Sequence, residues 1–116
     1  MNLYHVMIDL KDDAKALSFA RALEDWMTYL QGNGLIENWS LMRRKLNLAA
    51  DSARDFLLEV EVKDLAQLDQ AFGHTSAHSD DVEALYYPVN RMIAAADYAL
   101  YRPFPDSERA ERVALL

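Results

Sequence analysis

The sequence predicts an α+β domain in which four antiparallel strands form one sheet, with helices on one face, in the order βαββαβ. Two observations lead to it: apolar residues alternate with polar ones in some segments, as in strands, and recur every three to four positions in others, as in helices. The chain has 116 residues, of which 52% are hydrophobic, so one domain can bury a core of its own. We predict that domain over residues 1–103, followed by a tail over 104–116.

The first strand is predicted over residues 3–10, where side chains on one side are all apolar. Asp12 or Asp13 can then cap a helix whose apolar positions keep helical spacing until the glycine-containing turn at 32–34. A longer second strand is predicted over residues 36–48, ending in a polar turn.

The second half of the chain begins with the clearest strand, residues 56–62, where one side is wholly apolar and the other is mixed. Asp64 can cap a short helix that we expect Gly73 to end. The polar residues 74–79 are then predicted to form a loop.

Helical spacing returns over residues 82–96, with Ser79 or Asp80 as a cap. Pro88 lies inside this run. Because proline lacks a backbone donor and clashes with the preceding turn, we expect a kink there or a break into two short helices. A last short strand is predicted over residues 98–102.

This order of elements is the split βαβ arrangement of ferredoxin-like folds, with helices on one sheet face only. On the uncovered face we expect an apolar patch, which usually marks an interface; its predicted members are Leu3, His5, Met7, Trp39, Leu41 and Leu57. Arg43 and Lys45 are expected to lie on this face opposite Glu59 and Glu61. We therefore predict a homodimer in which two sheets pack face to face as a dimeric α+β barrel. The alternative is a monomer with one wet sheet face.

Composition excludes several classes of function. The net charge is −7 and basic residues do not cluster, so nucleic acid is not an expected partner. An RNA-recognition domain, which has the same strand order, would need a basic, glycine-containing third strand. No apolar run is long enough to span a membrane. The chain has no cysteine, which excludes thiolate chemistry and fits a reducing compartment, so we expect a soluble cytoplasmic protein.

Three segments, residues 5–11, 55–62 and 64–78, resemble the stress-responsive dimeric α/β-barrel (Dabb) family. The likeness rests on a histidine early in the first strand and on the pair His74 and His78. The family typically has a proline after the first histidine of the pair and a spacing of three, where this chain has a threonine and a spacing of four. The resemblance implies a ferredoxin-like subunit in a face-to-face dimer. Some members are cofactor-free enzymes that act on polyketide-like or aromatic substrates through a histidine and a tyrosine.

The candidate catalytic residues are His5 and His78, which can exchange protons near neutral pH, working with Tyr86 or Tyr87 at one ligand pocket. His74 follows the predicted helix end, where it can meet the negative helix terminus. For each of these residues the alternative is a structural role, as a hydrogen-bonded histidine or a packed aromatic side chain.

Apolar ligand contacts are predicted for Trp26, Trp39 and Phe72, together with His74, although aromatic residues at helical spacing are ordinarily core. His74 and His78 with Asp80 and Asp81 could in principle bind a metal, but they are expected to lie in a loop, so we predict neither metal nor cofactor. The leading hypothesis is a small-molecule-binding homodimer, either a binding protein alone or a cofactor-free enzyme, cyclase-like or monooxygenase-like, that acts on an apolar or aromatic substrate. The alternative is a non-catalytic stress-responsive or interaction protein.

Overall fold

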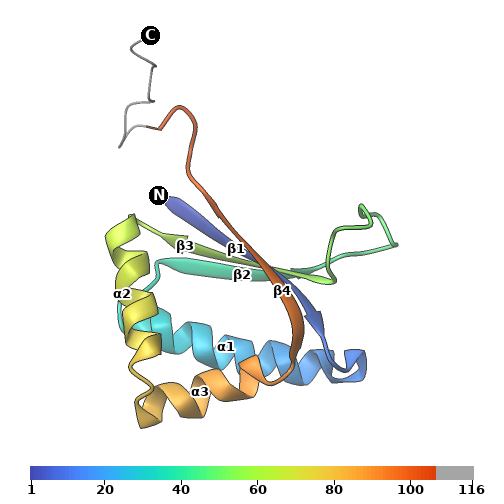
Figure 1. The fold of residues 1–116 in the computed structure, drawn as a ribbon, viewed down its shortest axis with the longest axis horizontal. Helices are drawn as coiled ribbons and strands as arrows, with labels where there is room; N and C mark the ends of the chain where they lie inside the picture. Colours follow the sequence, from blue (N-terminus) through green and yellow to red (C-terminus); the bar gives the residue numbers. More distant parts are fainter. Residues whose placement is uncertain (107–116) are drawn as a thin grey trace.

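The computed structural model describes residues 1–106, which form one four-stranded antiparallel sheet with helices on one face (Figure 1). The elements are β1 (Asn2–Leu10), a short 3₁₀ turn (Asp13–Lys15), α1 (Ala16–Gly32), β2 (Asn38–Arg43), β3 (Phe56–Val62), α2 (Leu65–Ser76), α3 (Asp80–Asn90) and β4 (Ile93–Tyr101). The strand order is β2-β3-β1-β4. The predicted ferredoxin-like α+β fold is confirmed; most of the predicted tail over 104–116 lies outside the described residues.

Capping side chains that the sequence predicts begin α2, α3 and the 3₁₀ turn before α1. Asp12 accepts a hydrogen bond from the N–H two residues on and starts the 3₁₀ turn that leads into α1. Asp64 caps α2 by accepting from the N–H of Gln67 at 2.8 Å, and Ser79 caps α3. These bonds satisfy donors that have no partner within the helix.

Helix α2 is longer than predicted. It continues through Gly73 and ends at Ser76, so the predicted loop 74–79 is wrong and only residues 77–79 link α2 to α3. Thr75 donates to the carbonyl of Ala71 at 2.9 Å, one turn back, as a helical threonine does. A glycine lowers helix stability by about 1 kcal/mol relative to alanine but does not by itself end a helix.

Helix α3 carries Pro88 in its last turn and ends two residues later, at Asn90. The predicted break into two helices is therefore wrong, because the residues up to Ala96 that we expected in the second helix belong to β4. That strand begins at Ile93 and pairs with β1, with Ala96 opposite Ile8. The missing proline donor coincides with the helix end, where the chain turns into the sheet.

Strand β2 is shorter than predicted and presents the opposite side. Trp39 and Leu41 lie opposite Val60 and Leu58, whose side chains are buried against the helices. The prediction that Trp39 and Leu41 lie on the uncovered face is wrong. Both sides of this short strand carry large apolar side chains, so the alternation of apolar and polar residues did not decide which side faces the helices.

We call the sheet face opposite the helices the open face. By the strand register it carries Leu3, His5, Met7, Asn38, Ser40, Met42, Leu57, Glu59, Glu61, Asp97, Ala99 and Tyr101. The predicted pairing of Arg43 and Lys45 with the two glutamates is wrong. Arg43 lies opposite Phe56, with its guanidinium 5.0 Å from the ring centre, and Lys45 lies beyond the end of β2.

The core fills the space between the sheet and the three helices. Its most deeply buried members include Ile8, Phe19, Leu23, Val62 and Val82. Gln67 is also buried, but its amide accepts from the N–H of Lys63 and donates to the carbonyl of Gly34. Asn2 is fully buried, and its amide has no hydrogen-bond partner among residues 1–106.

The connection between β2 and β3, residues 44–55, extends beyond the end of the sheet on the side away from α1 and α3 (Figure 1). We call it the arm. Its tip carries the exposed side chains of Leu46 and Leu48.

Candidate functional site

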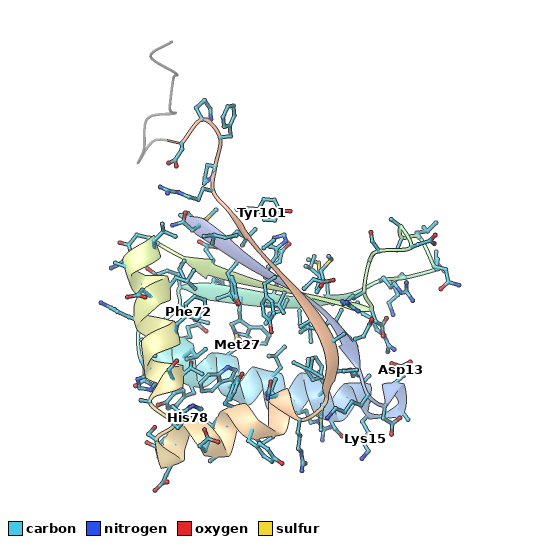
Figure 2. All side chains as sticks on the ribbon, in the orientation of Figure 1. Asp13, Lys15, Met27, Phe72, His78 and Tyr101 are labelled. Atoms are coloured by element: carbon cyan, nitrogen blue, oxygen red, sulfur yellow. The ribbon has the colours of Figure 1, made fainter. Side chains whose placement is uncertain are left out.

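A cavity of about 520 Å³ lies between the helix-facing side of the sheet and helices α1, α2 and α3. Figure 2 shows Met27 of α1 and Phe72 of α2 in this space, on the side of the sheet away from Tyr101. Most of the lining is apolar: Val6, Ile8, Leu23, Trp26, Met27, Leu30, Ile36, Leu58, Val60, Leu68, Ala71, Phe72, Val89 and Ile93. The apolar side chains of the sheet and of the helices thus face each other without filling all of the space between them, and this leaves the cavity.

The polar part of the lining consists of uncharged groups only. They are Tyr4, Thr75, Ser76, Tyr86, Asn90 and Tyr98. Tyr98 is 65% exposed and Phe72 47%, so these two side chains form the mouth, whereas Trp26 is only 5% exposed and lies deep. Since none of these groups is ionised at neutral pH, the cavity offers hydrogen bonds and aromatic faces but no ion pair.

Three tyrosines line the cavity from different elements, Tyr4 of β1, Tyr86 of α3 and Tyr98 of β4. Tyr4 of β1 stacks on Tyr98 of β4 with ring centres 6.1 Å apart, and meets Phe72 edge to face at 5.6 Å. Tyr86 of α3 places its hydroxyl 3.5 Å from Oδ1 of Asn90, one turn on. The phenols of β1 and α3 thus line one space although they are far apart in sequence.

Burial keeps these phenols protonated. It raises the pKa of Tyr4 to about 12, with smaller contributions from Tyr98 and Tyr86. Burial likewise raises the pKa of Tyr86, helped by Tyr98 and Glu83. At neutral pH both hydroxyls can donate a hydrogen bond to an oxygen of a bound molecule.

His74 lies behind the cavity wall rather than in it. Trp26 stacks on Tyr29 with ring centres 5.6 Å apart and nearly parallel planes. The Tyr29 hydroxyl lies 2.6 Å from Nε2 of His74, which is half-buried in the last turn of α2. His74 therefore supports a cavity residue through Tyr29 and does not itself line the cavity.

The structure does not bring His5 and His78 together at this cavity. His5 lies on the open face, with Nε2 3.5 Å from a Glu59 oxygen and its ring 4.9 Å from that of Tyr101. His78 lies in the link between α2 and α3, is exposed, and contacts Glu83 through Nδ1 at 2.5 Å. A sheet separates His5 from the cavity.

Of the predicted site residues, Trp26, Phe72 and Tyr86 line the cavity. Tyr87 is 58% exposed and outside it, and Trp39 is half-buried on β2, packed against the core. Sequence reasoning did not single out Tyr4 and Tyr98. For Tyr4 a signal was present, because it shares the strand side of the core residues Val6 and Ile8 and yet carries a hydroxyl.

The described residues hold neither a metal-binding cluster of side chains nor a helix that could span a membrane. No group of three or more histidine, cysteine, aspartate or glutamate side chains within residues 1–106 is placed to hold a metal ion. No helix in this part of the chain is long and apolar enough to cross a membrane.

Comparison with known families decides where the chain belongs. A model for a family of unknown function, DUF6614, matches residues 1–116. The chain is a member of DUF6614. No curated protein matches this DUF6614 chain.

Several solved structures resemble the DUF6614 chain in fold. The protein At3g17210 of Arabidopsis thaliana has a TM-score of 0.71 at 5% identity, over 89% of this chain and 95% of that one. A Dabb family protein with a ferredoxin-like fold from Mesorhizobium loti has a TM-score of 0.62 at 18% identity, over 89% of this chain and 96% of that one. A dimeric ferredoxin-like protein of unknown function from Thermobifida fusca has a TM-score of 0.58 at 16% identity, over 87% of this chain and 90% of that one. At these identities the likeness shows a common fold and nothing finer.

Proposed function

We propose that this DUF6614 protein is a Dabb-like homodimer that binds a small uncharged molecule in the cavity between sheet and helices. The observation that carries the proposal is the lining: a wide apolar wall with three tyrosines and no charged group. A volume near 520 Å³ falls within the range of about 300–1,000 Å³ that is usual for ligand pockets.

The lining also specifies the chemistry of the ligand. Trp26 and Phe72 offer faces and edges on which an aromatic ring can pack. Tyr4 and Tyr86 offer donors for one carbonyl or hydroxyl oxygen. A carboxylate or ammonium would lose its hydration without gaining an ion pair, so a neutral, largely aromatic compound with one oxygen acceptor fits best.

Cofactor-free catalysis is a second candidate function. It is favoured by the contact between the Tyr86 hydroxyl and the Asn90 side chain, both of which line the cavity. The phenol donates to Asn90, and by turning its O–H from Asn90 to a bound molecule it could donate to an oxygen on which negative charge develops, for example when a proton is removed next to a carbonyl. Tyr86→Phe would then lower turnover more than ligand affinity.

The homodimer is supported by the composition of the open face. Leu3, Met7 and Leu57 lie half-buried at its centre, and Met42 and Tyr101 extend the apolar area. No helix among the described residues covers this face. A patch of this kind on a single subunit favours a second copy as its cover.

Ligand binding can be tested with Trp26 as the reporter. In a Trp39→Phe variant Trp26 is the single tryptophan, and we expect the neutral fluorophore 1-aminoanthracene to quench its emission on binding. Ala71→Leu adds a branched side chain to the cavity wall and should weaken that binding about tenfold or more. The matched control is Ala66→Leu, on the exposed side of the same helix. Equal affinities in the two variants would exclude this cavity as the binding site.

The dimer is tested separately by light scattering. We expect a dimeric mass at micromolar concentration, and loss of the dimer in Leu57→Asp, which buries an unpaired charge at the centre of the interface. Leu65→Asp, at an exposed position of α2, is the control and should leave the mass unchanged. A monomeric wild-type protein would overturn this part of the proposal.

A further inference from the structure

We propose that the arm, residues 44–55, reaches across to the second copy of the chain, packing its two leucines against that copy and bringing Lys45 to the acidic side of the partner's open face. This inference rests on the proposed homodimer and adds to it a residue-level contact. It assigns a role to a segment that neither the core nor the cavity uses.

The root of the arm is held firmly to the sheet by ion pairs. Asp55 binds the guanidinium of Arg43 at 3.0 Å, and its N–H donates to Asp9 at 2.9 Å. Arg54 bridges Asp9 at 2.9 Å and Asp97 at 2.8 Å, which joins the arm to β1 and β4. Because these charges already satisfy one another, the cluster serves as an anchor that fixes the direction of the arm.

The tip of the arm exposes apolar side chains at a backbone cost. Leu46 is 86% exposed and Leu48 79%. Leu46 has φ 57° and Asn47 φ 56°, the left-handed region that suits asparagine or glycine but costs leucine about 1–2 kcal/mol. The turn itself would be served better by an asparagine at position 46, so the leucine contributes something other than turn geometry.

The arm and the open face lie on the same side of the sheet. In Figure 1 the arm lies away from α1 and α3, which cover the other side. A second copy that packs on the open face would therefore meet both the sheet and the arm, which makes that copy the occupant that the geometry favours.

The charges on the open face and on the arm indicate which residues meet in the dimer. The open face carries Glu59 and Glu61, and among the described residues of this face the one basic side chain beside them is His5, 3.5 Å from Glu59. Packing a second copy on this face removes both carboxylates from water, which costs free energy unless a cation joins them. Within residues 1–106 Lys45 forms no ion pair.

Lys45 lies too far from Glu61 of its own chain to form an ion pair with it. Glu61 lies five residues along β3 from Phe56, which is about 17 Å of strand, and Lys45 lies beyond the Phe56 end. If the β3 strands of two copies run antiparallel across the interface, the arm of one copy lies over the Glu61 end of the other. Lys45 and the partner's Glu61 can then pair in both directions, as two-fold symmetry requires.

Reciprocal charge reversal tests this contact. We expect Lys45→Glu and Glu61→Lys each to raise the dimer dissociation constant about tenfold in low salt, as measured by analytical ultracentrifugation. The double variant should return to within about threefold of wild type, because the pair is restored with its charges exchanged. Lys15→Glu, on the helix side of the sheet (Figure 2), makes the same change in net charge and should have no effect.

Leu46→Asn gives an independent readout. It should raise the stability of the monomer or leave it unchanged, because asparagine suits the left-handed turn, and yet weaken the dimer several-fold. Leu17→Asn, at an equally exposed site on α1, should not change dimerisation. If wild type is monomeric, the homodimer itself is wrong. If wild type is dimeric and Lys45→Glu or Leu46→Asn leaves the dissociation constant unchanged, the dimer stands and the proposed role of the arm is wrong.

Discussion

The hydroxyl of Tyr29 on α1 and Nε2 of His74 on α2 lie 2.6 Å apart, and this hydrogen bond ties the two helices together behind the cavity. The Tyr29 ring also stacks on Trp26, so the bond fixes the position of a residue that lines the cavity.

Tyr29→Phe should lower the free energy of unfolding by about 1 kcal/mol, the usual net value of one hydrogen bond, while the ring stack is kept. Urea denaturation measures this loss. Tyr87→Phe, on the exposed side of α3, is the control and should lie within the error of wild type. An unchanged midpoint in Tyr29→Phe would mean that water replaces the bond at no cost.

The raised pKa of Tyr4, about 12 in the folded protein, predicts a loss of stability in alkaline solution. The unfolded chain releases this proton near pH 10 and the folded chain near pH 12, so the unfolded state is stabilised relative to the folded one as the pH rises through this interval. Tyr4→Phe should flatten the fall in the unfolding midpoint between pH 10 and pH 12. If the variant loses stability as steeply as wild type, another group causes the fall.

The lowered pKa of Asp9 predicts a loss of stability in acid solution. Its pKa is lowered, first by the hydrogen bond from the N–H of Asp55 and then by Arg54. A lowered pKa gives stability at neutral pH that disappears as the pH falls below the unfolded value, near 3.9, and through the folded one. Asp9→Asn should therefore be less stable than wild type at pH 7 and approach it below pH 4. Asp69→Asn, at an exposed site on α2, should show no such convergence.

Asn2 predicts a stabilising substitution. Its side chain is fully buried on the helix side of β1, opposite Val62, and neither polar atom has a partner among the described residues. Removing an unsatisfied amide recovers its desolvation cost, so Asn2→Val should raise the free energy of unfolding by about 1–2 kcal/mol. Thermal and urea unfolding check this. A lower stability would show that the amide is hydrogen-bonded in solution.

Strands β1 and β3 and helix α1 could be predicted because one side of each is apolar and the other is mixed or polar. The register of β2 could not, because Trp39 and Met42 lie on different sides and are both apolar. The full length of α2 was missed because Gly73 is an ordinary helical residue, with open space where a side chain would lie. The alanine-rich start of β4 fits helix and strand spacing equally well.

Only part of the site could be predicted. Trp26, Phe72 and Tyr86 were found because residue type and helical spacing indicate an apolar wall. The cavity itself depends on how far the helices stand from the sheet, which no periodicity specifies. His5 was considered for its chemistry, although the alternation of β1 already put it on the side of Leu3 and Met7, away from the helices.

The sheet order β2-β3-β1-β4 leaves two outer strands, each with a row of backbone groups that no strand of the described chain pairs. Contact between two open faces is self-complementary and stops at two copies, whereas pairing of outer strands leaves another outer strand free and can continue. The closed pair and open-ended growth thus compete for the same subunit. A substitution that weakens the face-to-face contact would therefore produce monomers and would also favour larger assemblies, whose formation depends on protein concentration.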